Sequence, residues 1–274
     1  MRRFDFLKNF SCRLSYGISI TALALLLSAC SSTKDQDETA GWTPNKLYSE
    51  AQSAMISRDY DKAIEYLNKL EGRAAGTMLA QQAQLEAAYA MYKNGDKEDA
   101  VTALDRFMQL HPSSPAYDYA LYLKALVNFN DDLGFFGSIS NQDLSERDQQ
   151  AAKASFQTFS ELVTRFPDSK YAADARQRMV YIVNALAQSD VHIARYYYTR
   201  GAYVAAANRA QEAIQSYQQA PALEEALYIL YMSYDKLGMP QLRDDAKRVL
   251  DHNFPDSSFL TQGFRGSKPW WQLW

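Results

Sequence analysis

The chain has 274 residues, of which 47% are hydrophobic and 22% are charged, and its formal net charge is −3. This composition is close to that of soluble globular proteins and excludes a disordered chain and a polytopic membrane protein. The small negative charge argues against a nucleic-acid partner. With only 11 Gly and 8 Pro, the chain also has too few turn residues for a sandwich of many short strands.

Residues 1–29 are predicted to be a lipoprotein signal peptide. Several basic residues precede an apolar run from Ile18 to Leu27. That run is shorter than the roughly 20 residues of a membrane-spanning helix and fits a signal-peptide core. It ends in Leu27-Ser28-Ala29-Cys30, which resembles a bacterial lipobox, so Cys30 would carry a diacylglyceryl group and begin the mature chain. The alternative is an ordinary secretory signal in which the cysteine occurs by chance.

The residues after Cys30 predict where the chain is anchored. Several acyl chains hold a lipoprotein stably on a membrane, whereas one chain holds only weakly. Residue 31 is serine rather than aspartate, which is similar to lipoproteins sorted to the outer membrane. Residues 30–43 are mostly polar and predict a tether. We therefore expect a protein lipid-anchored at the cell outer membrane and facing the periplasm, without a free thiol because Cys12 leaves with the signal.

From residue 44 to residue 258, one helical pattern recurs along the chain. Ala100, Leu104 and Phe107 follow one another at i, i+4 and i+7, so they share one face of a helix. Pro112 follows and predicts the end of that helix. The same stripe recurs at Ala63, Leu67 and Leu70, at Ser155, Phe159 and Leu162, and at Ala206, Ala210 and Ala213.

The stripes predict antiparallel helix pairs. A small residue at the head of each stripe lets two helices approach closely, and Gly95, Gly201 and Gly238 stand where the tight turns need a positive φ. One pair cannot bury its apolar face alone, so pairs stack on one another. The pattern resembles the tetratricopeptide repeat, whose period is about 34 residues. We expect an all-α superhelical solenoid of about five such pairs, with an insertion near 130–150 and a degenerate fifth pair that has Arg243 at the small position.

No group of residues in the sequence forms a catalytic set. His192 lacks a helical i, i+4 partner for a metal, and His111 and His252 flank the ends of repeats. The sequence contains no glycine-rich phosphate loop, nucleophile elbow or His-Glu-x-x-His motif. The adjacent carboxylates Glu224-Glu225 and Asp244-Asp245 point apart on a helix, and we interpret both pairs as solvated. The chain is expected not to be an enzyme and to need no cofactor and no metal.

Aromatic and arginine residues alternate around a predicted tight turn between residues 193 and 210. Tyr197 and Tyr203 are either packing residues of the repeat or part of a partner surface. Arg195, Arg200 and Arg209 are harder to bury. Because Arg and Tyr are enriched in the energetic centres of interfaces, these arginines are the better candidates for a partner surface.

The same stretch carries a resemblance to a known family. It reads Ala-Arg-Tyr-Tyr from residue 194, Arg-Gly-Ala-Tyr-Val-Ala-Ala from residue 200 and Asn-Arg-Ala from residue 208. The chain also has the lipobox, Gly-Phe-Phe-Gly at 134–137, Ser-Glu-Arg-Asp at 145–148 and two Phe-Pro-Asp-Ser segments at 166–169 and 254–257. This combination resembles the BamD/YfiO/ComL family, the tetratricopeptide-repeat lipoproteins of the outer membrane β-barrel assembly machinery.

The resemblance implies a non-enzymatic scaffold that helps outer membrane β-barrel proteins to fold and insert. In that family the later repeats bind the periplasmic POTRA region of BamA, with companion Bam lipoproteins, and the earlier repeats receive the C-terminal signal of unfolded barrel proteins. The residues that fall in the BamA-facing part are Arg195, Arg200, Tyr203, Asn208 and Arg209. The tyrosines that fall in the early repeats, and so in a candidate substrate groove, are Tyr48, Tyr60, Tyr89 and Tyr92. Another repeat lipoprotein, such as a pilotin or a cell-wall-associated adaptor, would explain the lipobox and repeats but not the arginine–tyrosine string.

Residues 259–274 form a tail that contains Trp270, Trp271 and Trp274. If exposed, three tryptophans would make a large apolar patch, so we expect them to be covered. The tail either caps the last repeat, inserts into the groove of a partner or sits at the membrane interface, where Trp is favoured.

Overall fold

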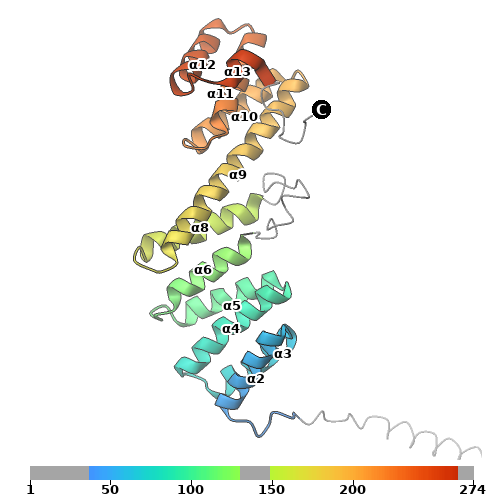
Figure 1. Ribbon diagram of the computed structural model, residues 1–274, viewed down its shortest axis with the longest axis vertical. Helices are drawn as coiled ribbons and strands as arrows, with labels where there is room; N and C mark the ends of the chain where they lie inside the picture. The colour runs from blue at the N-terminus through green and yellow to red at the C-terminus, as the bar shows by residue number, and fades with distance from the viewer. Residues whose placement is uncertain (1–36, 130–148, 265–274) are drawn as a thin grey trace, which may run out of the picture. The chain divides into compact units, whose positions relative to one another are not determined.

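The computed structural model describes residues 37–129 and 149–264, and every regular element among them is a helix (Figure 1). The helices are α2 (Pro44–Ser57), α3 (Tyr60–Arg73), α4 (Met78–Asn94), α5 (Lys97–Leu110), α6 (Tyr117–Asn128), α8 (Gln149–Arg165), α9 (Ala172–Thr199), α10 (Tyr203–Ser216), α11 (Leu223–Lys236), α12 (Pro240–Asn253) and α13 (Ser258–Gln262). The prediction of an all-α fold is confirmed. Cys30, the signal peptide, residues 130–148 of the insertion and residues 265–274 of the tail lie outside the described residues.

The helices pair in chain order (Figure 1). α2 packs on α3, α4 on α5, α6 on α8, α9 on α10 and α11 on α12, and each pair also contacts the next. α9 is 28 residues long, twice the length of α10. It contributes side chains to two hydrophobic cores. Its residue Ile182 joins the core built by α4 to α8, whereas Val191 joins the core built by α10 to α12. The described residues therefore form the predicted stack of helix pairs.

The predicted stripes form the core between the helices. Ala100 and Leu104 are fully buried, and every residue of the other three stripes has 0% exposure. Ser155 is the one polar member, and its hydroxyl donates a hydrogen bond of 2.9 Å to the carbonyl of Ala125 on α6. That bond satisfies the buried hydroxyl, which explains how serine can replace the alanine of the other pairs.

The tight turns inside the pairs use the left-handed region of the backbone. Gly95, Gly201 and Gly238 have φ of 98°, 79° and 69°, as the sequence predicts. The first pair has Arg58 at this turn, with φ of 63°. A residue with a Cβ pays roughly 1–2 kcal/mol in this region, so the first turn is more strained than the glycine turns.

The fifth pair departs from the stripe as expected. Arg243 of α12 is only partly covered, and its guanidinium reaches Asp235 at 3.4 Å and Asp244 at 2.8 Å. α12 instead buries Ala246 and Leu250. The contact between α11 and α12 therefore keeps a large residue at i+7 of the stripe, Leu250, whereas the buried small residue is Ala246 instead of residue 243.

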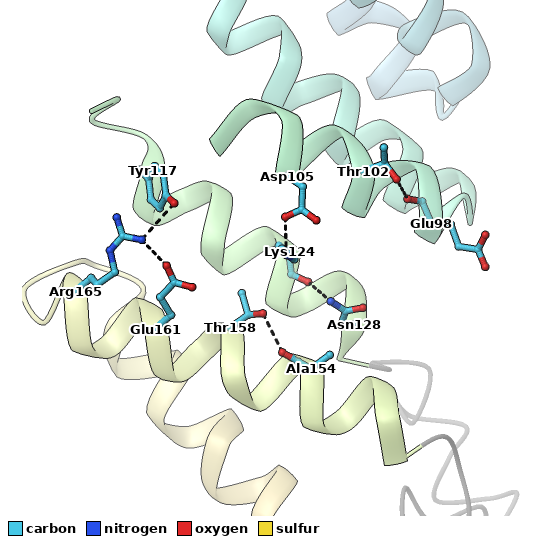
Figure 2. Close-up of polar contacts among 10 residues, drawn as sticks. All are labelled: Glu98, Thr102, Asp105, Tyr117, Lys124, Asn128, Ala154, Thr158, Glu161 and Arg165. Atoms are coloured by element: carbon cyan, nitrogen blue, oxygen red, sulfur yellow. Dashed lines mark hydrogen bonds and ion pairs between the residues drawn. The ribbon is translucent and has the colours of Figure 1, made fainter. Parts of the chain in front are cut away.

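Polar contacts join α6 to its neighbours α5 and α8 (Figure 2). Lys124 Nζ of α6 lies 2.6 Å from Asp105 Oδ1 of α5. On the α8 side, Arg165 donates to the Tyr117 hydroxyl at 3.3 Å and pairs with Glu161, and its guanidinium carbon lies 4.5 Å from the centre of the Tyr117 ring. Exposed ion pairs contribute little each, so these contacts mainly fix the orientation of one helix on the next.

Candidate functional site

A polar cluster joins the first helices of the first two pairs. Tyr48 of α2 donates a hydrogen bond of 2.9 Å to Glu86 Oε1 of α4, and Gln82 of α4 donates one of 2.6 Å to the Tyr48 hydroxyl. Gln52 of α2 donates to the other Glu86 oxygen. Tyr48 and Gln82, like Gln52 and Glu86, are 34 residues apart. Equivalent positions of successive repeats therefore meet across the α2–α4 contact.

An aromatic cluster continues this surface onto the third pair. Tyr119 and Tyr122 of α6 lie one helical turn apart, and both rings approach Tyr171, which directly precedes α9, at 5.6 Å and 4.6 Å. The Tyr122 hydroxyl donates to Asp174 Oδ2 at 2.7 Å, and Arg178 Nε reaches the same oxygen at 2.7 Å. We call the set Tyr48, Glu86, Tyr89, Tyr119, Tyr122 and Tyr171 the tyrosine face.

Three phenols of the tyrosine face, those of Tyr48, Tyr119 and Tyr122, have raised pKa values. Burial raises the pKa of Tyr119 to about 12, with smaller contributions from the neighbouring tyrosines Tyr171 and Tyr89 and from Glu86. Burial and the hydrogen bond to Asp174 raise the pKa of Tyr122 to about 12. Burial and then Glu86 also raise the pKa of Tyr48. At neutral pH the surface therefore offers neutral hydroxyl groups and aromatic rings, which suit a polypeptide ligand better than an ion.

These shifts predict how the helices respond to alkaline pH. A raised phenol pKa means that the native state keeps a proton that the unfolded state has lost. The contribution of these phenols to stability should therefore be present in full below about pH 10 and be lost between about pH 10 and 12. Following helicity by circular dichroism against pH checks this. Tyr119→Phe should make the fall shallower, whereas Tyr196→Phe, at a ring that is 55% exposed, should leave it unchanged. A fall of equal steepness in both variants would contradict the assignment.

The structure separates the four tyrosines expected in a substrate groove. Tyr48 and Tyr89 belong to the tyrosine face. Tyr60 is the first residue of α3 and packs on the small core formed by Ala54, Ala63 and Ala90. Tyr92 packs on the main core, with the Lys93 ammonium 5.9 Å from its ring centre.

Among the residues expected to face BamA, Arg195 is held by the chain itself. Its guanidinium forms a two-point ion pair with Glu225 of α11, and Glu225 is only 9% exposed. The prediction that Glu225 is solvated is therefore wrong, although its neighbour Glu224 is partly exposed. Adjacent residues on a helix point about 100° apart, so one of the two carboxylates faces α9 and the other faces outward.

Arg209 is also bound within the chain. Its Nη1 lies 3.4 Å from Asp190 of α9 and 3.0 Å from Glu212 of α10. Asp190 is 7% exposed, and burial raises the pKa of its carboxyl even though the Arg209 charge opposes that shift. Arg209 therefore neutralises a buried acid and helps to hold α10 on α9.

Two of the five predicted partner residues are exposed, and Tyr203, like Arg195 and Arg209, is half-buried. Arg200 and Asn208 are exposed. The Arg200 guanidinium lies 5.2 Å from the Tyr196 ring centre, beside the turn at Gly201. Tyr203 is half-buried, with its ring 5.4 Å from that of Tyr198. The free donors of this region are therefore concentrated on Arg200 and Asn208.

The sequence interpretation missed Glu86, Tyr119, Tyr122 and Tyr171. One signal could have found part of this set: Tyr119 and Tyr122 are three residues apart, which places them on one helix face. The contact of both with Tyr171 crosses the 130–150 insertion, so no local spacing reveals it. The contact of Glu86 with Tyr48 and Gln52 joins α4 to α2, so it cannot be found from the spacing within one helix.

The described residues contain neither a helix that could span a membrane nor a cluster of metal ligands. None of the described helices has the length and apolar character needed to cross a bilayer. Within residues 37–129 and 149–264, no three His, Cys, Asp or Glu side chains are placed to hold a metal ion together. His111 lies with its Nε2 3.0 Å from the Gln84 side-chain oxygen and its ring 5.0 Å from Phe107, so it is part of the repeat packing.

Comparison with known proteins identifies the family. The family model described as "YfiO: Outer membrane lipoprotein" matches residues 41–249. A protein of Neisseria meningitidis serogroup A is 48% identical over 92% of this chain and 97% of its own length. A Vibrio cholerae protein is 36% identical over 85% of this chain and 96% of its own length. A Haemophilus influenzae protein is 32% identical over 86% of this chain and 89% of its own length. All three are named outer membrane protein assembly factor BamD. The chain therefore belongs to the BamD/YfiO family of outer membrane lipoproteins.

Proposed function

We propose that this chain is a non-enzymatic assembly factor of the outer membrane, which binds BamA with companion Bam proteins and helps unfolded β-barrel proteins to fold and insert. The observation that carries the proposal is the 48% identity to a protein named outer membrane protein assembly factor BamD, over 92% of this chain and 97% of that relative. The stacked helix pairs fit a scaffold, because such stacks offer extended surfaces to several partners at once.

The proposed attachment to the membrane is a lipid anchor at Cys30, with the helix pairs in the periplasm. Cys30→Ala removes the thiol that accepts the diacylglyceryl group, so the variant should remain uncleaved or appear as a soluble periplasmic protein. Membrane fractionation and the mass of the N-terminal peptide check this, and Cys12→Ala should behave like the wild type. Recovery of acylated Cys30→Ala protein in the outer membrane would contradict the proposal.

The proposed binding site for the barrel substrate is the tyrosine face. Its rings can stack on the aromatic side chains of an extended segment, and its phenol oxygens can accept hydrogen bonds from the backbone N–H groups of that segment. Tyr48 and Tyr89 would contact the segment directly. Tyr60 and Tyr92 would support the same region through the packing of α3 and α4.

The proposed BamA-facing surface centres on the turn between α9 and α10. Arg200 and Asn208 are exposed polar residues of this surface, and Tyr196 beside Arg200 is 55% exposed. Arg195, Arg209 and Tyr203 would contribute by fixing α9, α10 and α11 behind that surface. An exposed arginine beside an exposed tyrosine is typical of the centre of an interface.

A charge reversal at this surface tests the function. Arg200→Glu should weaken BamA binding by about 2–5 kcal/mol, because it removes one charge of a pair that is desolvated in the complex, while the helical content stays the same. Affinity purification from detergent-solubilised envelopes measures the recovery of BamA. Arg248→Glu, the same change at a side chain on α12 that is 75% exposed, is the matched control. Equal recovery with both variants would place the interface elsewhere.

A further inference from the structure

The chain's C-terminal segment folds back onto the last helix pairs. α13 contacts α11, and Phe259 of α13 is 8% exposed, with its ring 5.5 Å from that of Tyr228 and nearly parallel to it. Leu260 packs on the same core. Residues 258–264 are therefore part of the structure rather than the start of a free tail.

Glycine at position 263 makes the turn that follows α13. Gly263 has φ of 60° and ψ of −151°, a combination that only glycine adopts readily. A Cβ at this position would lie 3.3 Å from the Tyr228 hydroxyl oxygen. The backbone thus passes directly over Tyr228 in a conformation that other residues would not take.

The turn places the Phe264 ring in contact with two tyrosine rings, those of Tyr198 and Tyr228. Its ring centre lies 5.2 Å from that of Tyr198, at the end of α9, and 5.1 Å from that of Tyr228 of α11. The ring centre of Tyr203 of α10 lies 5.4 Å from that of Tyr198. Tyr198 and Tyr228 lie on the first helices of the last two pairs.

We propose that Tyr198 of α9 and Tyr228 of α11 form a peptide-binding site that the chain's own residues 258–264 occupy, with Phe264 as the anchor. Phe264 is seated there as a ligand side chain would be, held by ring contacts to two different helices. Because the segment is covalently attached, its effective concentration at this site is of millimolar order. A free peptide of the same sequence must therefore compete with it.

Peptide binding to the full-length chain tests the proposal. The probe is a fluorescently labelled peptide of residues 256–268, which includes Phe259 and Phe264 but none of the tryptophans, and fluorescence anisotropy reports its binding. Phe264→Ala removes the ring that contacts Tyr198 and Tyr228, so this variant should bind the peptide at least tenfold more tightly than the wild type. Adding Tyr198→Ala to that variant should abolish the gain, and a peptide with Phe264→Ala should not bind.

Two further variants separate a binding site from a general effect on folding. Leu242→Ala truncates an exposed apolar side chain of α12 and should bind the peptide as weakly as the wild type. Gly263→Val leaves Tyr198 and Tyr228 unchanged but displaces Phe264. This variant should therefore bind the peptide as tightly as Phe264→Ala does. It replaces Phe264→Ala in the test if Phe264→Ala loses helicity. Equal affinity of the wild type, Phe264→Ala and Gly263→Val, or no binding to any of them, would overturn the proposal.

Discussion

Replacing Phe159 by alanine is expected to lower the free energy of unfolding by about 3–5 kcal/mol, because a fully buried aromatic ring is removed and a cavity remains. Phe159 has 0% exposure and lies on α8, where its ring centre is 6.1 Å from Tyr122 and 6.3 Å from Phe129. The loss should therefore loosen the contact between α6 and α8 and also disturb the tyrosine face.

Urea denaturation followed by circular dichroism measures this effect. Repeat stacks depart from two-state unfolding when neighbouring units lose contact, so a separate early transition for Phe159→Ala would also fit. Val180→Ala is the matched control, because Val180 is an apolar residue of α9 that is 61% exposed. A midpoint for Phe159→Ala within error of the control would contradict the packing of the third pair.

The second large effect is expected at the ion pair between α9 and α11. Arg195→Met should cost about 2–4 kcal/mol, because it leaves the carboxylate of Glu225 unpaired in a site where that side chain is only 11% exposed. Adding Glu225→Leu should restore most of the loss, since replacing both members of a buried pair by apolar residues is often nearly neutral.

A double-mutant cycle on thermal unfolding measures the coupling between these two residues. Arg200→Met serves as the control, because Arg200 is exposed and has its guanidinium over Tyr196. If the losses of stability in the Arg195 and Glu225 single variants simply add in the double variant, the ion pair between the two residues is contradicted. BamA recovery from the restored double variant would also separate a positioning role of Arg195 from direct contact with the partner.

The repeat core could be predicted from the sequence because its signal is local. A small residue followed by large apolar residues at i+4 and i+7 needs only one helix to be recognised, and all stripes built this way are buried. The glycine turns follow for the same reason, because a positive φ is a property of a single residue. Arg58 shows the limit of that inference, since its turn adopts the same conformation without glycine.

The candidate sites could be predicted only in part because they depend on contacts between repeats. Arginine is enriched both at interfaces and in buried ion pairs, so its presence in the 193–210 stretch does not distinguish the two roles. The partners that decide the matter, Asp190 for Arg209 and Glu225 for Arg195, lie 19 and 30 residues away. The same reasoning explains why Glu225 was expected in solvent.

The most direct test of an assembly function is the folding rate of a β-barrel protein in liposomes that contain BamA, measured with and without this chain. Conversion of the unfolded barrel protein to a protease-resistant form reports folding. We predict that the wild-type chain accelerates this conversion and that Arg200→Glu accelerates it much less, whereas Arg248→Glu behaves like the wild type. Equal rates with and without the wild-type chain would contradict the account.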